Sequence, residues 1–112
     1  MTSTRQLSDQ VRAELLDHIP PGWASAAACA TSDLNPDAWF TEPGEHAWSA
    51  ARAVCWSCPV RQPCLASALA RTESGLWGGY SEAQRATARS ALTEGVPVSL
   101  VLQLGETTGR AA

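Results

Sequence analysis

Four cysteines constrain this chain more than any other feature. They are Cys29, Cys55, Cys58 and Cys64, in the spacing C-x25-C-x2-C-x5-C. The Cys-x-x-Cys pair places two thiols at one turn, and the last cysteine adds a third thiol from the same corner. The first cysteine comes from a distant segment, so its recruitment closes a long loop. The spacing therefore predicts one centre that ties the two halves of the chain together.

The chain has few large apolar residues with which to build a core. Leu, Ile, Val and Phe account for only 19 of its 112 residues, whereas 20 are Ala. A fraction that low lies at the limit for independent folding. Small domains with weak cores usually depend on a metal or a disulfide staple. We therefore expect the cysteines to stabilise the fold.

Charge and hydropathy exclude several classes of protein. The first 22 residues contain no apolar run of the kind found in secretory signals, and nowhere do eighteen apolar residues follow one another. We therefore expect a cytoplasmic protein without a membrane span, whose cysteines are metal ligands or redox groups rather than structural disulfides. The net charge of −3 and pI of about 5.2 disfavour free-standing binding to nucleic acid or to an anionic membrane.

Periodicity and turn signals predict an all-α single domain of four to five short helices organised around the cysteine site. The expected helices cover residues 5–17, 23–29, 45–54, 63–71 and 81–95. Leu7, Val11 and Leu15 share one face of the first helix. Gly75 is expected to cap the fourth helix, and Ser81 begins the last one with a capping box.

These elements suggest three regions along the chain. Residues 1–22 form a helical extension, residues 23–80 form the core that contains the cysteine site, and residues 81–112 form a C-terminal helix and a flexible tail. Within the tail, the apolar run at 98–104 is too short to be classified as strand or helix.

Three chemistries compete for the four thiols. An iron–sulfur cluster needs four thiolates and tolerates uneven spacing, whereas a structural zinc site commonly shows two paired knuckles. Two disulfides would need an oxidising compartment. The spacing favours a cluster over zinc and leaves all three open, with His18 and His46 as alternative ligands. Backbone N–H groups of Gly75, Gly78 and Gly79 either offset the charge of a cluster or serve only a tight turn.

The aromatic residues divide between core and surface. Trp23, Trp48 and Trp56 suit a core, because an indole buries a large apolar area. Trp39, Phe40 and Trp77 stand in predicted loops beside Pro or Gly, where aromatic residues usually mark an interface. We predict that the latter three bind a partner.

Several motifs together resemble the WhiB-like family of bacterial transcription regulators over residues 23 to 90. They are the cysteine spacing, Trp23, the NPDAWF run at 35–40, the CPVR run at 58–61, Cys64-Leu65 with Ala68-Leu69, and the GLWGG run at 75–79. The chain departs from the family at Trp39-Phe40, where two Phe are common. The segment after Gly79 also departs, because its three Arg are balanced by three Glu.

The resemblance implies a 4Fe–4S cluster, sensitive to oxygen and nitric oxide, on the four cysteines. It implies binding to region 4 of the primary sigma factor of RNA polymerase, with Trp39, Phe40 and Trp77 in the contact. Family members also touch promoter DNA through a basic C-terminal segment, for which only Arg85 and Arg89 are candidates here, so any DNA contact is weak and made within the sigma complex.

Two other functions remain as alternatives. One is a disulfide reductase in the cluster-free form using Cys55 and Cys58, whose freed thiols can pair as disulfides. No thioredoxin-like βαβ pattern surrounds that pair, so we expect no enzyme and assign no catalytic residue. The other is a zinc-stapled structural adaptor.

Overall fold

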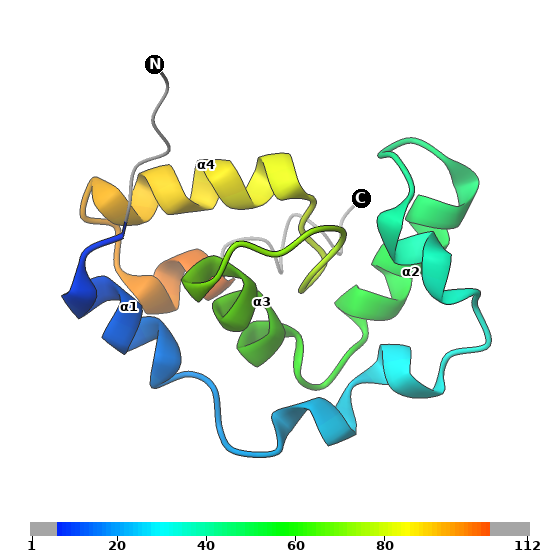
Figure 1. The fold of residues 1–112 in the computed structure, drawn as a ribbon, viewed down its shortest axis with the longest axis horizontal. Coiled ribbons are helices and arrows are strands. Elements are labelled where there is room, and N and C mark those ends of the chain that lie inside the picture. The colour runs from blue at the N-terminus through cyan, green and yellow to red at the C-terminus, as the bar shows by residue number, and fades with distance from the viewer. Residues whose placement is uncertain (1–6, 104–112) are drawn as a thin grey trace.

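The computed structural model describes residues 7–103, and its regular elements are helices joined by turns and loops (Figure 1). Its α-helices are α1 (Asp9–Leu16), α2 (His46–Trp56), α3 (Arg61–Ala70) and α4 (Glu82–Thr93), and its 3-10 helices are η1 (Trp23–Ala26), η2 (Ala28–Thr31) and η3 (Pro36–Phe40). Residues 98–103 are also helical. Between residues 7 and 103 the one strand-like feature is an isolated bridge that pairs Trp77 with Tyr80. The predicted all-α class is confirmed.

Local capping signals determine where two of the helices begin. The Ser8 hydroxyl accepts the backbone N–H of Val11 at 3.2 Å and caps α1. At α4, the Ser81 hydroxyl accepts the N–H of Gln84, and the Gln84 side chain accepts the N–H of Ser81 in return. This reciprocal pair is the predicted capping box.

The larger core joins both ends of the described chain to its middle. It consists of Leu7, which precedes α1, and of residues from α1, α3, α4 and the 98–103 segment, namely Leu15, Leu65, Ala66, Leu69, Ala70, Ala88, Leu92, Val98, Val101 and Leu102. In Figure 1 the 98–103 segment (orange) lies between α4 and α1. The run at 98–104 is therefore a core helix as far as residue 103, and the N-terminal extension packs into the same core from Leu7 onward. Residue 104 and the rest of the predicted flexible tail lie outside the described residues.

A smaller core lies beneath α2. It consists of Ala38, Trp39, Ala51, Cys55 and Leu76, with Leu34, Ala47, Trp48 and Val54 packed against it. Helix α2 contacts both η3 and η2. This second core places the segment that carries Cys29 beside the helix that carries Cys55.

Arginines from two other helices cap the C-terminus of α3. The guanidinium of Arg89 donates to the carbonyls of Ala68 at 2.8 Å, Leu69 at 3.2 Å and Arg71 at 2.7 Å. Arg12 donates to Ala70 at 3.3 Å. These cations satisfy carbonyls that a helix end leaves without partners.

The prediction that Gly75 caps this helix is wrong. Helix α3 ends at Ala70, its C-cap Arg71 is extended, and Gly75 lies further along the chain. The arginine side chains perform the capping instead.

No helix between residues 7 and 103 combines the length and apolar character that crossing a membrane would require.

Candidate metal centre and partner surface

The four cysteines lie on separate segments, namely η2, α2, the turn after α2, and α3. Cys29 is exposed on η2, Cys55 is buried near the end of α2, and Cys58 and Cys64 are partly buried. The backbone N–H of Ala28 donates to the sulfur of Cys58 at 3.3 Å, which joins η2 to the Cys-x-x-Cys turn.

The thiols act on one another electrostatically. The pKa of Cys64 is raised to about 12, mainly by burial, and negative charge on Cys55, Cys29 or Cys58 contributes in the same direction. Burial is also the main reason that the pKa of Cys55 is raised, with Cys29 and Cys58 contributing in the same direction. Cys55 and Cys64 are therefore near enough to other cysteines for charge on one thiol to raise the pKa of another.

The side chains do not form a ready-made ion site. Across residues 7–103, no group of three or more His, Cys, Asp or Glu side chains is placed so that it could hold a metal ion. The predicted ligand set therefore stays a prediction, and its support is the chemistry of the thiols and their surroundings.

Hydrogen-bond donors point at the two most buried thiols. The Trp39 side chain and the backbone N–H of Gly79 donate to Cys55, and the backbone N–H of Gly78 donates to Cys64. Each of these bonds favours the thiolate and lowers the pKa of its acceptor, in opposition to burial. These donors offset part of the effect of burial, which still leaves the pKa of both thiols raised.

Only glycine fits the turn that carries these donors. Trp77 and Tyr80 exchange backbone hydrogen bonds of 3.1 and 2.9 Å, and between them φ is +58° at Gly78 and +81° at Gly79. Positive φ at both central residues is the requirement of a type I′ turn. A Cβ added at Gly78 would lie 2.6 Å from the Cβ of Leu65, and a Cβ added at Gly79 would lie 2.7 Å from the indole nitrogen of Trp56. The turn therefore rests directly on the helices that carry Cys55 and Cys64.

Gly75 does not take part in this arrangement. Its N–H donates to the Glu82 carboxylate at 2.9 Å, and its φ is +86°. A Cβ there would lie 2.8 Å from the carbonyl oxygen of Trp39. The position needs glycine because η3 approaches it closely.

The neighbouring aromatics of η3 point to opposite sides of the fold. Trp39 is only 9% exposed and belongs to the smaller core, whereas Phe40 is 64% exposed. The prediction that Trp39 contacts a partner is therefore wrong, because its ring is buried beside Cys55. Trp77 is half-buried and its indole N–H donates to the Ser74 carbonyl at 2.9 Å. Trp23, Trp48 and Trp56, expected in the core, are half-buried.

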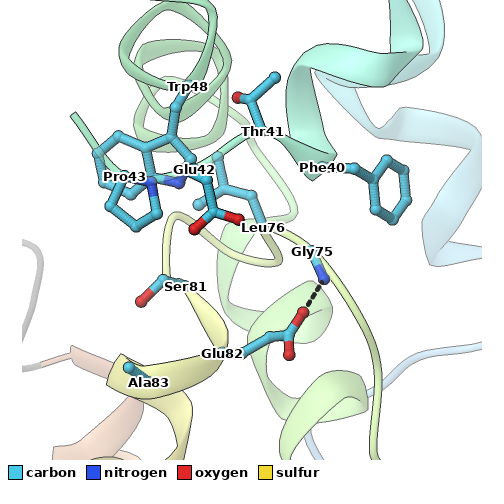
Figure 2. A pocket seen from close by; sticks show the side chains of 10 residues that line it. All are labelled: Phe40, Thr41, Glu42, Pro43, Trp48, Gly75, Leu76, Ser81, Glu82 and Ala83. Carbon is cyan, nitrogen blue, oxygen red and sulfur yellow. Dashed lines mark hydrogen bonds between the residues drawn. The ribbon is translucent and has the colours of Figure 1, made fainter. Parts of the chain in front are cut away.

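A groove lies between the η3–α2 connection and the start of α4 (Figure 2). It is lined by Phe40, Thr41, Glu42, Pro43, Trp48, Gly75, Leu76, Ser81, Glu82 and Ala83. In Figure 2 the Glu42 carboxylate lies close to Pro43, Trp48 and Leu76, and the Phe40 ring lies on the far side of Gly75. The only charged side chains in this lining are the carboxylates of Glu42 and Glu82. The groove thus combines apolar surface with negative charge.

The prediction that Arg85 contacts DNA phosphates is also wrong. Its side chain is 1% exposed, and its guanidinium donates to the carbonyls of Gly75 and Tyr80 at 2.8 Å and of Glu73 at 2.6 Å. Arg89, partly buried, is held by the carbonyls at the end of α3. Burial lowers the pKa of both guanidinium groups. Both side chains face the protein, where they donate to backbone carbonyls at the C-terminal end of α3 and in the segment that follows it.

Arg61 is a residue of this site that the sequence analysis did not assign. It is 4% exposed and donates to the carbonyls of Gly78 at 3.0 Å and Leu102. Its guanidinium carbon lies 4.5 Å from the centroid of the Trp56 ring. Its position inside the cysteine motif, three residues after Cys58, is the signal that would have singled it out.

Comparison with known proteins places this sequence in a family. Residues 23–88 match the family model described as transcription factor WhiB. The chain belongs to the WhiB family. The matched segment holds all four cysteines and the Gly78-Gly79 turn, whereas α1 and the 98–103 helix lie outside it.

Individual WhiB relatives resemble the same part of the chain. The transcriptional regulator WhiB of Streptomyces coelicolor is 42% identical over 71 residues, which cover 62% of this chain and 78% of that protein. WhiB2 of Mycolicibacterium smegmatis is 45% identical over 56% of this chain and 47% of its own length. WhiB2 of Mycobacterium tuberculosis is 44% identical over 56% of this chain and 68% of its own. All three are named as transcriptional regulators, and no solved structure matches the chain.

Proposed function

We propose that this WhiB-family chain is a cytoplasmic, redox- and nitric-oxide-responsive regulator of transcription that holds one 4Fe–4S cluster and binds region 4 of the primary sigma factor. The observation that carries the proposal is the surroundings of Cys55 and Cys64, which are affected by charge on the other cysteines and receive backbone N–H donors from the Gly78-Gly79 turn. Family membership supports the role in transcription.

The residues present suit such a cluster. Four cysteine thiolates are the usual ligand set of a 4Fe–4S centre, and hydrogen bonds to the sulfurs tune it. Cys29, Cys55, Cys58 and Cys64 would hold the cluster, which supplies one-electron chemistry and reactivity toward oxygen and nitric oxide. The N–H groups of Ala28, Gly78 and Gly79 would stabilise the thiolates, and the Trp39 indole would cover Cys55.

Anaerobic purification tests the cofactor. We expect a coloured protein with about four iron and four sulfide per chain, because a complete cubane needs all four thiols. Exposure to air is expected to bleach the visible absorbance as the cluster is lost. A colourless, folded protein that contains zinc and no sulfide would contradict the proposal and favour the zinc-stapled adaptor.

The partner surface consists of Phe40, the adjoining groove and Trp77. Phe40 is the most exposed large apolar residue among those described, and the groove beside it offers apolar walls with two carboxylates. An exposed aromatic at the centre of a surface patch is typical of a binding hot spot. The carboxylates of Glu42 and Glu82 would favour a partner that presents a basic side chain next to an apolar one.

Replacing Phe40 by Ala is expected to weaken binding to purified sigma region 4 by about thirtyfold or more. That factor corresponds to the ~2 kcal/mol cost of truncating a hot-spot aromatic. Trp77→Ala is expected to act in the same direction. The measurement is anaerobic calorimetry on cluster-loaded protein, with iron and sulfide assayed in each sample.

Leu16→Ala serves as the matched control, because Leu16 is an exposed apolar residue on α1, which belongs to the larger core rather than to the groove. This variant is expected to bind as the wild type does. Equal affinity of the wild type and Phe40→Ala would refute the proposed surface. Because Arg85 and Arg89 are held by backbone carbonyls, we propose that promoter DNA is reached through the sigma complex.

A further inference from the structure

The start of α4 holds Gly75 by both of its backbone polar groups. The Glu82 carboxylate accepts the Gly75 N–H at 2.9 Å, and the Arg85 guanidinium donates to the Gly75 carbonyl at 2.8 Å. Glu82 and Arg85 are three residues apart, so they lie on one face of the helix. Burial lowers the pKa of Arg85, and the charge of Glu82 opposes that shift, which shows that the two side chains act on each other. One helix face therefore determines where Gly75 lies.

Gly75 in turn supports the exposed aromatic ring of the partner surface. A Cβ added at Gly75 would lie 2.7 Å from Cδ1 of Phe40, so the ring packs directly against the glycine backbone. Figure 2 shows Gly75 between the Glu82 carboxylate and the Phe40 ring. The next residue, Leu76, donates its N–H to the Trp39 carbonyl at 2.8 Å, which holds the backbone just before Phe40. The position of the ring thus depends on the position of Gly75.

An exposed ring gains affinity when it is held in place before a partner arrives. The Phe40 side chain is 64% exposed, so the Gly75 backbone is an important part of what restricts it. A side chain that is ordered only on binding reduces the affinity by the entropy that it loses. A ring that already rests on a fixed backbone loses less.

We propose that Glu82 is a positioning residue for the partner surface, because its hydrogen bond to Gly75 holds the backbone against which the Phe40 ring rests. The inference rests on the proposed binding to sigma region 4. This role is separate from any attraction between the Glu82 carboxylate and a basic side chain of the partner. It depends on a hydrogen-bond acceptor at the right reach, whereas the attraction depends on charge.

Two replacements of Glu82 separate the hydrogen bond from the charge. The amide oxygen of Gln can accept the Gly75 N–H, whereas Ala offers no acceptor. Glu82→Ala is expected to weaken binding to purified sigma region 4 about tenfold, because the ring is then ordered only on binding. Glu82→Gln is expected to stay within about threefold of the wild type, since it loses only an exposed charge. Anaerobic calorimetry on cluster-loaded protein measures both.

Two further variants serve as controls for charge. Glu42→Gln removes the other carboxylate of the groove and is expected to match Glu82→Gln. Glu94→Ala removes an exposed carboxylate at the C-cap of α4 and is expected to bind as the wild type does. Equal losses in Glu82→Ala and Glu82→Gln would overturn the proposal, because charge alone would then explain the effect. Wild-type affinity of Glu82→Ala would overturn it as well.

A double-mutant cycle with Phe40→Ala shows whether Glu82 acts through the ring. Without the ring, the Gly75 backbone has nothing to position. Glu82→Ala is therefore expected to weaken binding by less than about threefold further in the Phe40→Ala background. A full tenfold loss in that background would show two independent contributions and would contradict the positioning role.

Hydrogen exchange of the loaded chain without partner gives a readout that no contact with sigma can affect. Peptides that contain Gly75 and Leu76 are expected to exchange about tenfold faster in Glu82→Ala, because the bond that protects this backbone is lost. Glu82→Gln is expected to keep wild-type exchange there, and residues 65–70 of α3 are expected to keep theirs in both variants. Unchanged exchange at Gly75 in Glu82→Ala would refute the proposal.

A variant with the charge but not the reach covers the case in which Glu82→Ala does not fold. Glu82→Asp keeps the carboxylate on a side chain one methylene shorter. It is expected to bind more weakly than Glu82→Gln, and the reverse order would overturn the positioning role. If the loaded wild type does not bind sigma region 4, the proposed partner and this inference fail together. With wild-type binding intact, the outcomes above refute the positioning role alone.

Discussion

Replacing Arg85 by Met is expected to lower the free energy of unfolding by about 3–5 kcal/mol. The Met side chain keeps apolar volume but donates no hydrogen bond. The carbonyls of Glu73, Gly75 and Tyr80 would therefore lose the donor that the guanidinium provides. Such a loss is a large part of the stability of a domain of this size. Chemical denaturation of the anaerobic protein measures it.

Arg71→Met is the control for the loss of charge, because Arg71 is exposed. A surface substitution of this kind is expected to change the free energy of unfolding by no more than about 0.5 kcal/mol. Wild-type stability of Arg85→Met, together with weaker binding to promoter DNA, would contradict the structural role of Arg85. That result would instead support the contact between Arg85 and DNA phosphates that the sequence suggests.

The case of Arg85 shows where sequence reasoning stops. Helical periodicity correctly places Arg85 and Arg89 on one face of α4, but it does not say whether that face meets solvent or protein. Because charged residues are rarely buried unless they are paired, the sequence alone favours a face that meets solvent. The deciding factor is the set of unpaired carbonyls after α3, and their position depends on contacts between segments far apart in the sequence.

Elements with strong local signals could be predicted. The capping box at Ser81 is confirmed, because it depends on neighbours within one turn. Leu7, Val11 and Leu15 do pack into one core, but α1 begins only at Asp9, so Leu7 is not part of the helix. The helix at 98–103 could not be predicted, because the seven-residue run at 98–104 suits strand and helix equally. Its conformation is determined by packing against α1, α3 and α4.

The candidate site was predictable in its residue types but less so in their orientation. Gly78 and Gly79 were expected to form a tight turn, and they do so with positive φ. Trp39 and Phe40 were expected to act together. Adjacent residues of a short 3-10 helix point in different directions, so one ring enters the core beside Cys55 and the other faces solvent. Only the position of η3 against α2 decides which ring is buried.

Replacing Cys29 by Ser is expected to abolish cluster binding without disturbing the rest of the fold. The residue is exposed on η2, so the change removes one thiolate and no core contact. Iron and sulfide are expected to fall to background, because no fourth cysteine ligand would remain. Thr31→Ala, on the same 3-10 helix, is expected to retain the cluster. Wild-type iron and sulfide in Cys29→Ser would show that Cys29 is not a ligand.

The same variant measures how much the cluster stabilises the protein. A ligand at Cys29 closes a loop of 25 intervening residues, and the entropy of that closure corresponds to about 3.5 kcal/mol if the cluster acts like a disulfide across it. Loaded wild type should therefore exceed Cys29→Ser in stability by about that amount, while the two cluster-free proteins should unfold alike. Cys55→Ser should be less stable than either cluster-free protein, because Cys55 is part of the smaller core. A cluster-free Cys55→Ser that unfolds exactly as cluster-free Cys29→Ser does would show that the buried thiol serves only as a ligand.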